Sequence, residues 1–257
     1  MILNSIYNKV KVKVKKALPL CLFALLPSSA VAQSDDFGLD FSLEAEKKLS
    51  KKWSLGFEGE LRTRDNTKTV DRWSGGLSAD FKITKWLKAS AGYNFLYDNN
   101  ERITYKTTGA INKEAHYWGV RHRFNVSLTA SQKISNLKFS LRERWQYTYR
   151  PEKTVDRWDY DDEEWEKKTY NGKGTNVLRS RLQIEYDKKG LAITPYANVE
   201  FFNAWSLQKT RFHVGADWKL SKQHTIGAFY RYQTVRDDDD DNEPNIHMIG
   251  LSYKFKF

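Results

Sequence analysis

Arginine is the residue type that gives this sequence its chemistry. Arg-x-Arg pairs occur at four places, and in an extended strand this spacing puts both guanidinium groups on one face. A guanidinium is always charged and binds carboxylate or phosphate through two parallel hydrogen bonds. Two single arginines also lie on the polar face of their own alternating segments. The four pairs and these two residues are the candidates for pore lining and anion contact. These candidates are Arg62, Arg64, Arg121, Arg123, Arg142, Arg144, Arg179, Arg181, Arg211 and Arg231.

Acidic residues share the face of the arginines and allow two interpretations. In the first, the arginines stay free to attract anionic solutes; in the second, they pair with the carboxylates and fill the enclosed space. The sequence leaves both interpretations open. The acids with this phase are Glu58, Glu60, Asp80, Glu185, Glu200 and Asp217.

Alternating apolar and polar residues form the elements that must position these side chains. In "WGVRHRFNVSLTA" (118–130), Val120 and Phe124 occupy one face while Arg121 and Arg123 occupy the other. Eleven such segments of about ten residues follow one another. A tilted strand needs roughly 9–11 residues to cross a bilayer, whereas strands of soluble proteins more often have about 5–6. The segments therefore predict transmembrane strands.

The connections between these segments alternate in length. Some are short, such as 84–85 and 187–190, and others are long and charged, such as 98–115 and 151–174. Tryptophan and tyrosine gather at the segment ends, as in the two aromatic girdles of a membrane barrel. We therefore predict an all-β fold, an antiparallel transmembrane β-barrel with short periplasmic turns and long extracellular loops.

The eleven alternating segments do not by themselves give the number of strands in the barrel wall. Single-chain bacterial barrels have an even number of strands, and eleven segments do not fit that rule. We expect ten strands if segment 37–47 is not a full wall strand, or twelve if one strand is hidden within 98–115.

The first 32 residues have the layout of a cleaved secretory signal peptide. A lysine block precedes the apolar run Ala17–Pro27, and Ala-x-Ala closes the segment at Ala32. We predict a signal peptide at 1–32, a barrel domain at 33–257, and a location in the outer membrane of a Gram-negative cell. Five lysines and no acids leave with the signal, so the net charge falls from +11 to +6, which argues against a nucleic-acid partner. Cys21 is the single cysteine and leaves too.

The chain ends on "MIGLSYKFKF", which is apolar on every second residue to the last position. The last strand of a barrel must close on the first, so that no edge is left in the membrane. Tyr253, Phe255 and Phe257 also resemble the C-terminal signal that the outer-membrane assembly machinery reads. We expect that machinery to be a partner.

Several stretches resemble one known family. They are "LEAEKKLSKKWSLGFEGELRTRD", "DRWSGGLSADFKITKWLKASAGYNFLYD" and "SLRERWQYTYR". They resemble an outer-membrane β-barrel family known only as a domain of unknown function, and the resemblance covers about 36–257. It implies the fold and the location, and it brings no established active site.

The predicted function is a porin-like passive channel for small anionic solutes. The alternative is a plugged barrel with a structural or surface-binding role through the loops at 98–115, 151–174 and 236–245. An outer-membrane hydrolase is a third possibility, but His213 has no serine placed against it, and metal-binding His/Cys spacing is absent. We therefore expect no enzyme, cofactor or metal site. The other partners are outer-membrane lipid and lipopolysaccharide.

Overall fold

The computed structural model describes residues 35–236 and 244–257. The predicted signal peptide at 1–32 and most of the acidic run at 236–243 lie outside the described residues. Asp36–Phe257 forms one compact unit. Its strands are β1 (Asp36–Lys48), β2 (Trp53–Arg64), β3 (Thr69–Lys82), β4 (Leu87–Tyr105), β5 (Ile111–Ile134), β6 (Leu137–Arg150), β7 (Lys153–Asp159), β8 (Glu164–Tyr170), β9 (Lys173–Tyr186), β10 (Ile193–Ala204), β11 (Ser206–Lys219), β12 (His224–Val235) and β13 (Ile246–Lys256). Within the described ranges there is no helix long and apolar enough to cross a membrane.

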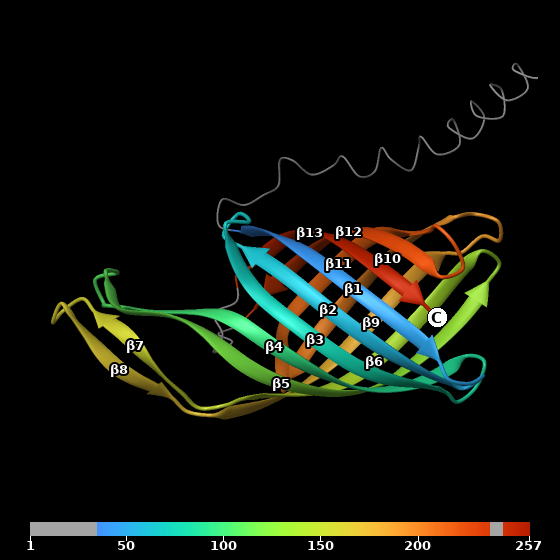
Figure 1. The fold of residues 1–257 in the computed structure, drawn as a ribbon. Coiled ribbons are helices and arrows are strands. Elements are labelled where there is room, and N and C mark those ends of the chain that lie inside the picture. The colour runs from blue at the N-terminus through green and yellow to red at the C-terminus, as the bar shows by residue number, and fades with distance from the viewer. Residues whose placement is uncertain (1–34, 237–243) are drawn as a thin grey trace, which may run out of the picture. The chain divides into compact units, whose positions relative to one another are not determined.

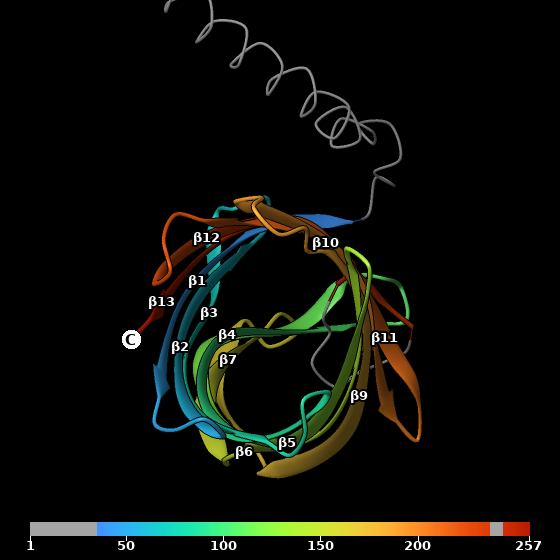
Figure 2. The same cartoon turned by 90° about the vertical axis from the view of Figure 1, so that its right-hand side faces the viewer.

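Eleven of the strands that the structure describes close into a barrel (Figures 1 and 2). Strands β1 to β6 pair in sequence, β6 pairs with β9, and β9 to β13 pair in sequence. The barrel closes where β13 pairs with β1. The predicted all-β transmembrane barrel is confirmed.

The expected count of ten or twelve strands is wrong. Segment 37–47 is a full wall strand, and 98–115 adds no strand because it lengthens β4 and β5. The odd number is possible because β1 pairs with β13 in parallel, while the other barrel pairs are antiparallel. A parallel ladder satisfies the backbone groups of both edges as an antiparallel one does, which is what the bilayer requires.

The two faces of the wall are inverted relative to a soluble protein. Apolar side chains in mid-strand point outward and are half exposed, including Phe57, Val126 and Leu182. Polar side chains such as Gln146 and Glu200 point inward and are buried. In water the outward face would be costly, and in a bilayer it meets lipid tails.

Exposed tryptophans lie at both ends of the strands, as the sequence predicts. Trp53, Trp86 and Trp218 are near the short turns, while Trp73 and Trp145 are toward the long loops. Large aromatic rings favour the two membrane–water interfaces. The rings thus mark the span that the bilayer covers.

The last strand is paired to its final residue. The Phe257 amide donates a hydrogen bond to the Glu46 carbonyl at 2.9 Å, and its own carbonyl accepts one from the Lys48 amide at 3.2 Å. Tyr253 and Phe257 face outward, and the Phe257 ring stacks on Phe255 with centroids 5.4 Å apart. The C-terminus therefore closes the seam with no free edge.

Strands β4 and β5 continue beyond the barrel rim, where the hairpin β7–β8 joins them (Figure 1). We call β7, β8 and the outer parts of β4 and β5 the arm. Ala115, Tyr117 and Val155 form its small apolar core, on which Tyr170 packs. The segments 98–115 and 151–174, which the sequence analysis treats as loops, are therefore largely stranded.

Candidate functional site

Two large cavities lie inside the barrel, among the residues that the structure describes. The outer cavity has a volume of about 800 Å³ and reaches the long-loop end at Trp205 and Gln208. The inner cavity has about 850 Å³ and reaches the short-turn end at Lys52 and Trp86. Space therefore exists inside the barrel toward both of its ends.

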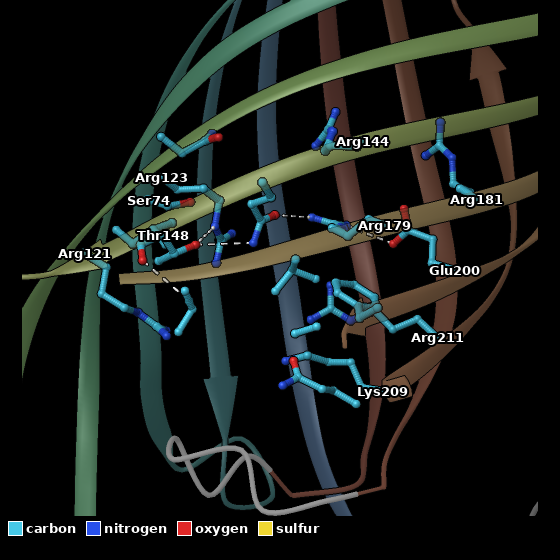
Figure 3. Close-up of a pocket in the computed structure, with 18 of the residues that line it drawn as sticks. Ser74, Arg121, Arg123, Arg144, Thr148, Arg179, Arg181, Glu200, Lys209 and Arg211 are labelled. Carbon is cyan, nitrogen blue, oxygen red and sulfur yellow. Dashed lines mark hydrogen bonds and ion pairs between the residues drawn. The ribbon is translucent and has the colours of Figure 1, made fainter. Parts of the chain in front are cut away.

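Three arginines border both cavities. Arg142 and Arg144 on β6, and Arg181 on β9, line the outer and the inner cavity alike. The two spaces therefore meet at a layer of guanidinium groups. Figure 3 shows Arg144 and Arg181 projecting from the wall toward this space.

The structure places the ten arginines predicted from the sequence on the lumenal side. Arg64 lines a small pocket of about 80 Å³ near the long-loop end. The other nine line the outer cavity: Arg62, Arg121, Arg123, Arg142, Arg144, Arg179, Arg181, Arg211 and Arg231. Their contact with an anion stays a prediction.

The predicted lumenal acids are spread along the barrel. Glu58, Glu60 and Glu200 line the outer cavity, and Asp80 and Glu185 line the inner one. Asp217 lies on the same face of β11, opposite Thr194 and Gly227 in the ladders. It borders neither of these two cavities.

Two further cations line the outer cavity and escape the sequence analysis. Arg72 directly precedes the alternating segment that starts at Trp73, so it is not among the ten candidates, whereas β3 begins earlier, at Thr69. Lys209 lies on the same face as Arg211 in β11, which begins at Ser206, earlier than the alternating segment that contains Arg211. With them, the outer cavity has eleven arginine and lysine residues in its described lining, against four glutamates.

The arginines toward the long-loop end are matched by carboxylates. Asp40 accepts from Arg62 at 3.1 Å and from Arg231 at 2.9 Å. Asp98 accepts from Arg72 and, at 2.7 Å, from Arg121. Both acids are buried, and neither is among the predicted lumenal acids. In this part of the lumen the pairing interpretation holds.

Strands β6 and β9 differ, because like charges face each other across the ladder. Arg142 is opposite Arg181, and Arg144 is opposite Arg179. Glu200 on the neighbouring β10 accepts a hydrogen bond from Arg142. It accepts another from Arg179 at 3.0 Å (Figure 3). We call the four arginines of these two pairs the arginine quartet.

An aromatic ring holds the cations on one side of the quartet. The guanidinium carbons of Arg179 and Arg211 lie 4.5 and 4.7 Å from the ring centroid of Phe202, and Lys209 Nζ lies 5.5 Å from it. Cation–π contacts of this kind orient a planar guanidinium. The ring thus holds Arg179, one member of the quartet, beside Arg211 and Lys209.

The arm carries a cluster that local spacing did not reveal. His116 Nε2 lies 2.6 Å from a Glu114 oxygen and 3.7 Å from a Glu101 oxygen, and these three side chains could hold a metal ion. The β4–β5 register brings Glu101 opposite His116. Hydrogen bonds from Tyr160 and His116 lower the pKa of Glu114.

The histidine considered for catalysis is engaged elsewhere. His213 Nδ1 lies 2.8 Å from Asn198 Oδ1, within the lumenal wall. Its ring also meets Phe229 edge-on, with centroids 5.8 Å apart. This arrangement gives His213 a structural hydrogen bond, and the absence of enzymatic activity stays a prediction.

Comparison with known families and structures agrees with the fold. The family described as "Protein of unknown function (DUF2490)" matches residues 37–243. The β domain of the Bordetella autotransporter BrkA aligns with a TM-score of 0.50 and 13% identity, over 80% of this chain and 82% of that one. The translocator domain of NalP from Neisseria meningitidis gives 0.47 and 13%, over 73% and 70%. The CymD monoaromatic hydrocarbon channel gives 0.39 and 10%, over 74% and 66%. No curated protein matches the chain.

Proposed function

The chain belongs to the family described as "Protein of unknown function (DUF2490)", and on that premise we propose that it is a passive outer-membrane channel for small anionic solutes. The observation that carries the proposal is the pair of cavities on either side of an arginine layer. These cavities support an open lumen over one that paired side chains fill.

The charge of the lining favours anions over cations. Eleven cationic side chains face four glutamates around the outer cavity. One unit charge at 4 Å contributes about 1 kcal/mol even in bulk water, which is roughly a fivefold change in occupancy. The low-dielectric wall focuses the field further, so several arginines together give a strong preference.

Export and assembly complete the proposal. The signal-peptide layout at 1–32 supports secretion across the inner membrane. Tyr253 and Phe257 are exposed on the outer face at the short-turn end, where the assembly machinery could read them. Outer-membrane lipid and lipopolysaccharide would then contact the apolar belt.

Ion selectivity tests the channel. The chain without residues 1–32 is refolded and inserted into planar bilayers, and the reversal potential is measured across a potassium chloride gradient. We expect discrete conductance steps with anion preference. Arg144→Gln should reduce the anion-to-cation permeability ratio by about fivefold. Lys167→Gln, which removes an exposed charge from the arm, is the matched control and should leave the ratio unchanged.

A second candidate rests on the arm. Trp165 and Tyr105 are each more than half exposed there, and exposed aromatic side chains are common at binding surfaces. A folded barrel that passes no current would favour a structural or surface-binding role for the arm.

A further inference from the structure

We propose that the arginine quartet, Arg142, Arg144, Arg179 and Arg181, is a binding site for one multivalent oxyanion. The chemical class is a small solute with two or more negative charges on carboxylate, phosphate or sulfate oxygens. The inference deepens the proposed channel function and rests on it, because it names the solute that the lumen selects.

The register of the β6–β9 ladder brings like charges together. Arg142 faces Arg181 and Arg144 faces Arg179 on adjacent antiparallel strands. Like charges directly opposite each other destabilise a sheet. Two such pairs in succession concentrate four positive charges on one patch of the wall, and an anion at this place would remove the repulsion.

The arginines of the quartet have hydrogen-bond donors that the described residues leave unused. The Nε atoms of all four arginines are buried and have no hydrogen-bond partner among these residues. Arg144 and Arg181 make no hydrogen bond or ion pair with any residue that the structure describes. Buried polar groups normally have a partner, and several orphans together indicate an absent ion or water.

The positive charge of the quartet is only partly matched by bonded carboxylates. Glu200 is the carboxylate that bonds to it, and it uses one oxygen for Arg142 and the other for Arg179. Gln146 accepts a further bond from Arg179 at 3.1 Å. Glu58 and Glu185 act on Arg144 and Arg181 from a distance, but neither is bonded to the quartet. The guanidinium forks that no carboxylate occupies suit a dianion better than chloride.

A solute has access to the quartet from both cavities. Arg142, Arg144 and Arg181 line both cavities, so a solute can reach them from either end of the barrel. A guanidinium fork matches two oxygen atoms of one anion, whereas chloride offers a single acceptor. A channel site must also release its solute, and a site open on two sides allows that.

Calorimetry of the refolded barrel in detergent micelles tests the site directly. Sodium sulfate and disodium succinate are titrated separately at constant ionic strength, with sodium chloride as the balancing salt. We expect saturable binding of one dianion per barrel. Sulfate alone would identify a compact tetrahedral oxyanion, and succinate alone would identify a dicarboxylate.

Variants of the quartet give the expected change. Arg144→Gln and Arg181→Gln should each raise the dissociation constant about tenfold, which corresponds to about 1.4 kcal/mol. Arg144→Lys keeps the charge and loses the fork, so it should also weaken binding. Lys138→Gln is the control, because Lys138 lies on the same strand and lines the inner cavity, where Glu185 is its partner at 3.1 Å. It should change the constant less than about twofold.

The stability of the ligand-free variants distinguishes a binding role of these arginines from a structural one. Since the quartet repels itself, Arg144→Gln should leave the ligand-free barrel as stable as the unchanged protein, or more stable. An arginine with only a structural role would lower stability when replaced. Loss of stability in both glutamine variants, with dianion affinity unchanged, would overturn the proposal.

The site and the channel can fail separately, because binding in micelles requires no current. A silent barrel that binds sulfate through Arg144 and Arg181 would retain the site and refute the channel. An anion-selective barrel with no saturable heat for either dianion would retain the channel and refute the site.

Discussion

Replacing Glu200 by glutamine should both destabilise the barrel and sharpen its anion preference. The Glu200 side chain is 3% exposed and joins Arg142 to Arg179. Removing one partner of a buried charge pair costs about 3–5 kcal/mol. Because the neighbouring cavities admit water, we expect the lower end of this range, about 3 kcal/mol.

Urea unfolding of the refolded barrel measures this loss. With a slope of about 2 kcal/mol/M, the midpoint should fall by about 1.5 M. Glu185→Gln is the matched control, because its bond to Lys138 is more exposed and should cost at most about 1 kcal/mol. In planar bilayers, Glu200→Gln should raise the anion-to-cation permeability ratio by about fivefold, since it removes a negative charge beside the arginine layer.

Three results for Glu200→Gln would contradict these expectations. Equal midpoints for Glu200→Gln and Glu185→Gln would show that the bonds from Arg142 and Arg179 do not stabilise the wall. An unchanged permeability ratio would show that Glu200 lies away from the conduction path, and a lower anion preference would contradict the electrostatic reasoning.

Two further predictions concern the wall and the arm. Gly38→Ala should lower the free energy of unfolding, measured in urea, by about 1–3 kcal/mol, because the new Cβ would overlap the Thr63 backbone carbonyl oxygen. Gly59→Ala is the control, because its Cβ would meet open space and the change should be neutral or slightly stabilising. Similar losses of stability in both variants would refute the overlap. Hydrogen bonds from Lys113 lower the pKa of Asp159 below its ordinary value of 3.8, so this contribution to the arm is complete above about pH 4 and is lost as the pH falls further. Hydrogen-exchange protection of β7 and β8, corrected for intrinsic rates, should therefore fall at acidic pH before that of the barrel, and equal protection at about pH 3 and pH 6 would contradict this.

The faces of the strands could be predicted from the sequence because a strand has a period of two. Every second residue of "SLRERWQYTYR" points the same way, so Arg142 and Arg144 could be assigned to the lumen from their spacing alone. The girdle tryptophans followed from the same phase and from the turn positions.

Partners across the sheet could not be predicted, because alternation says nothing of which strands meet. The ion pairs of Asp40 with Arg62 and Arg231 depend on β1 lying between β2 and β13. The parallel pairing of β1 with β13 also depends on which strands meet. It gives the barrel eleven strands, whereas the rule used in the sequence analysis expects an even number. The like-charge register of Arg144 and Arg179 also required the β6–β9 pairing, which skips the arm hairpin.

The arm was missed for a different reason. Its strand β8, "EWEKKTY", is charged and short, and the arm extends beyond the barrel rim, so no lipid-facing alternation marks it. Its order comes from contacts between distant segments, such as Lys113 with Asp159 and Glu166. Local pattern predicts such structure poorly.

The most direct test of the central claim is the reversal potential of the refolded barrel in a planar bilayer across a potassium chloride gradient. We predict discrete steps whose reversal potential has the sign of anion preference, reduced by Arg144→Gln and unaffected by Lys167→Gln. A folded barrel that passes no current, or one that prefers potassium, would contradict the proposed channel.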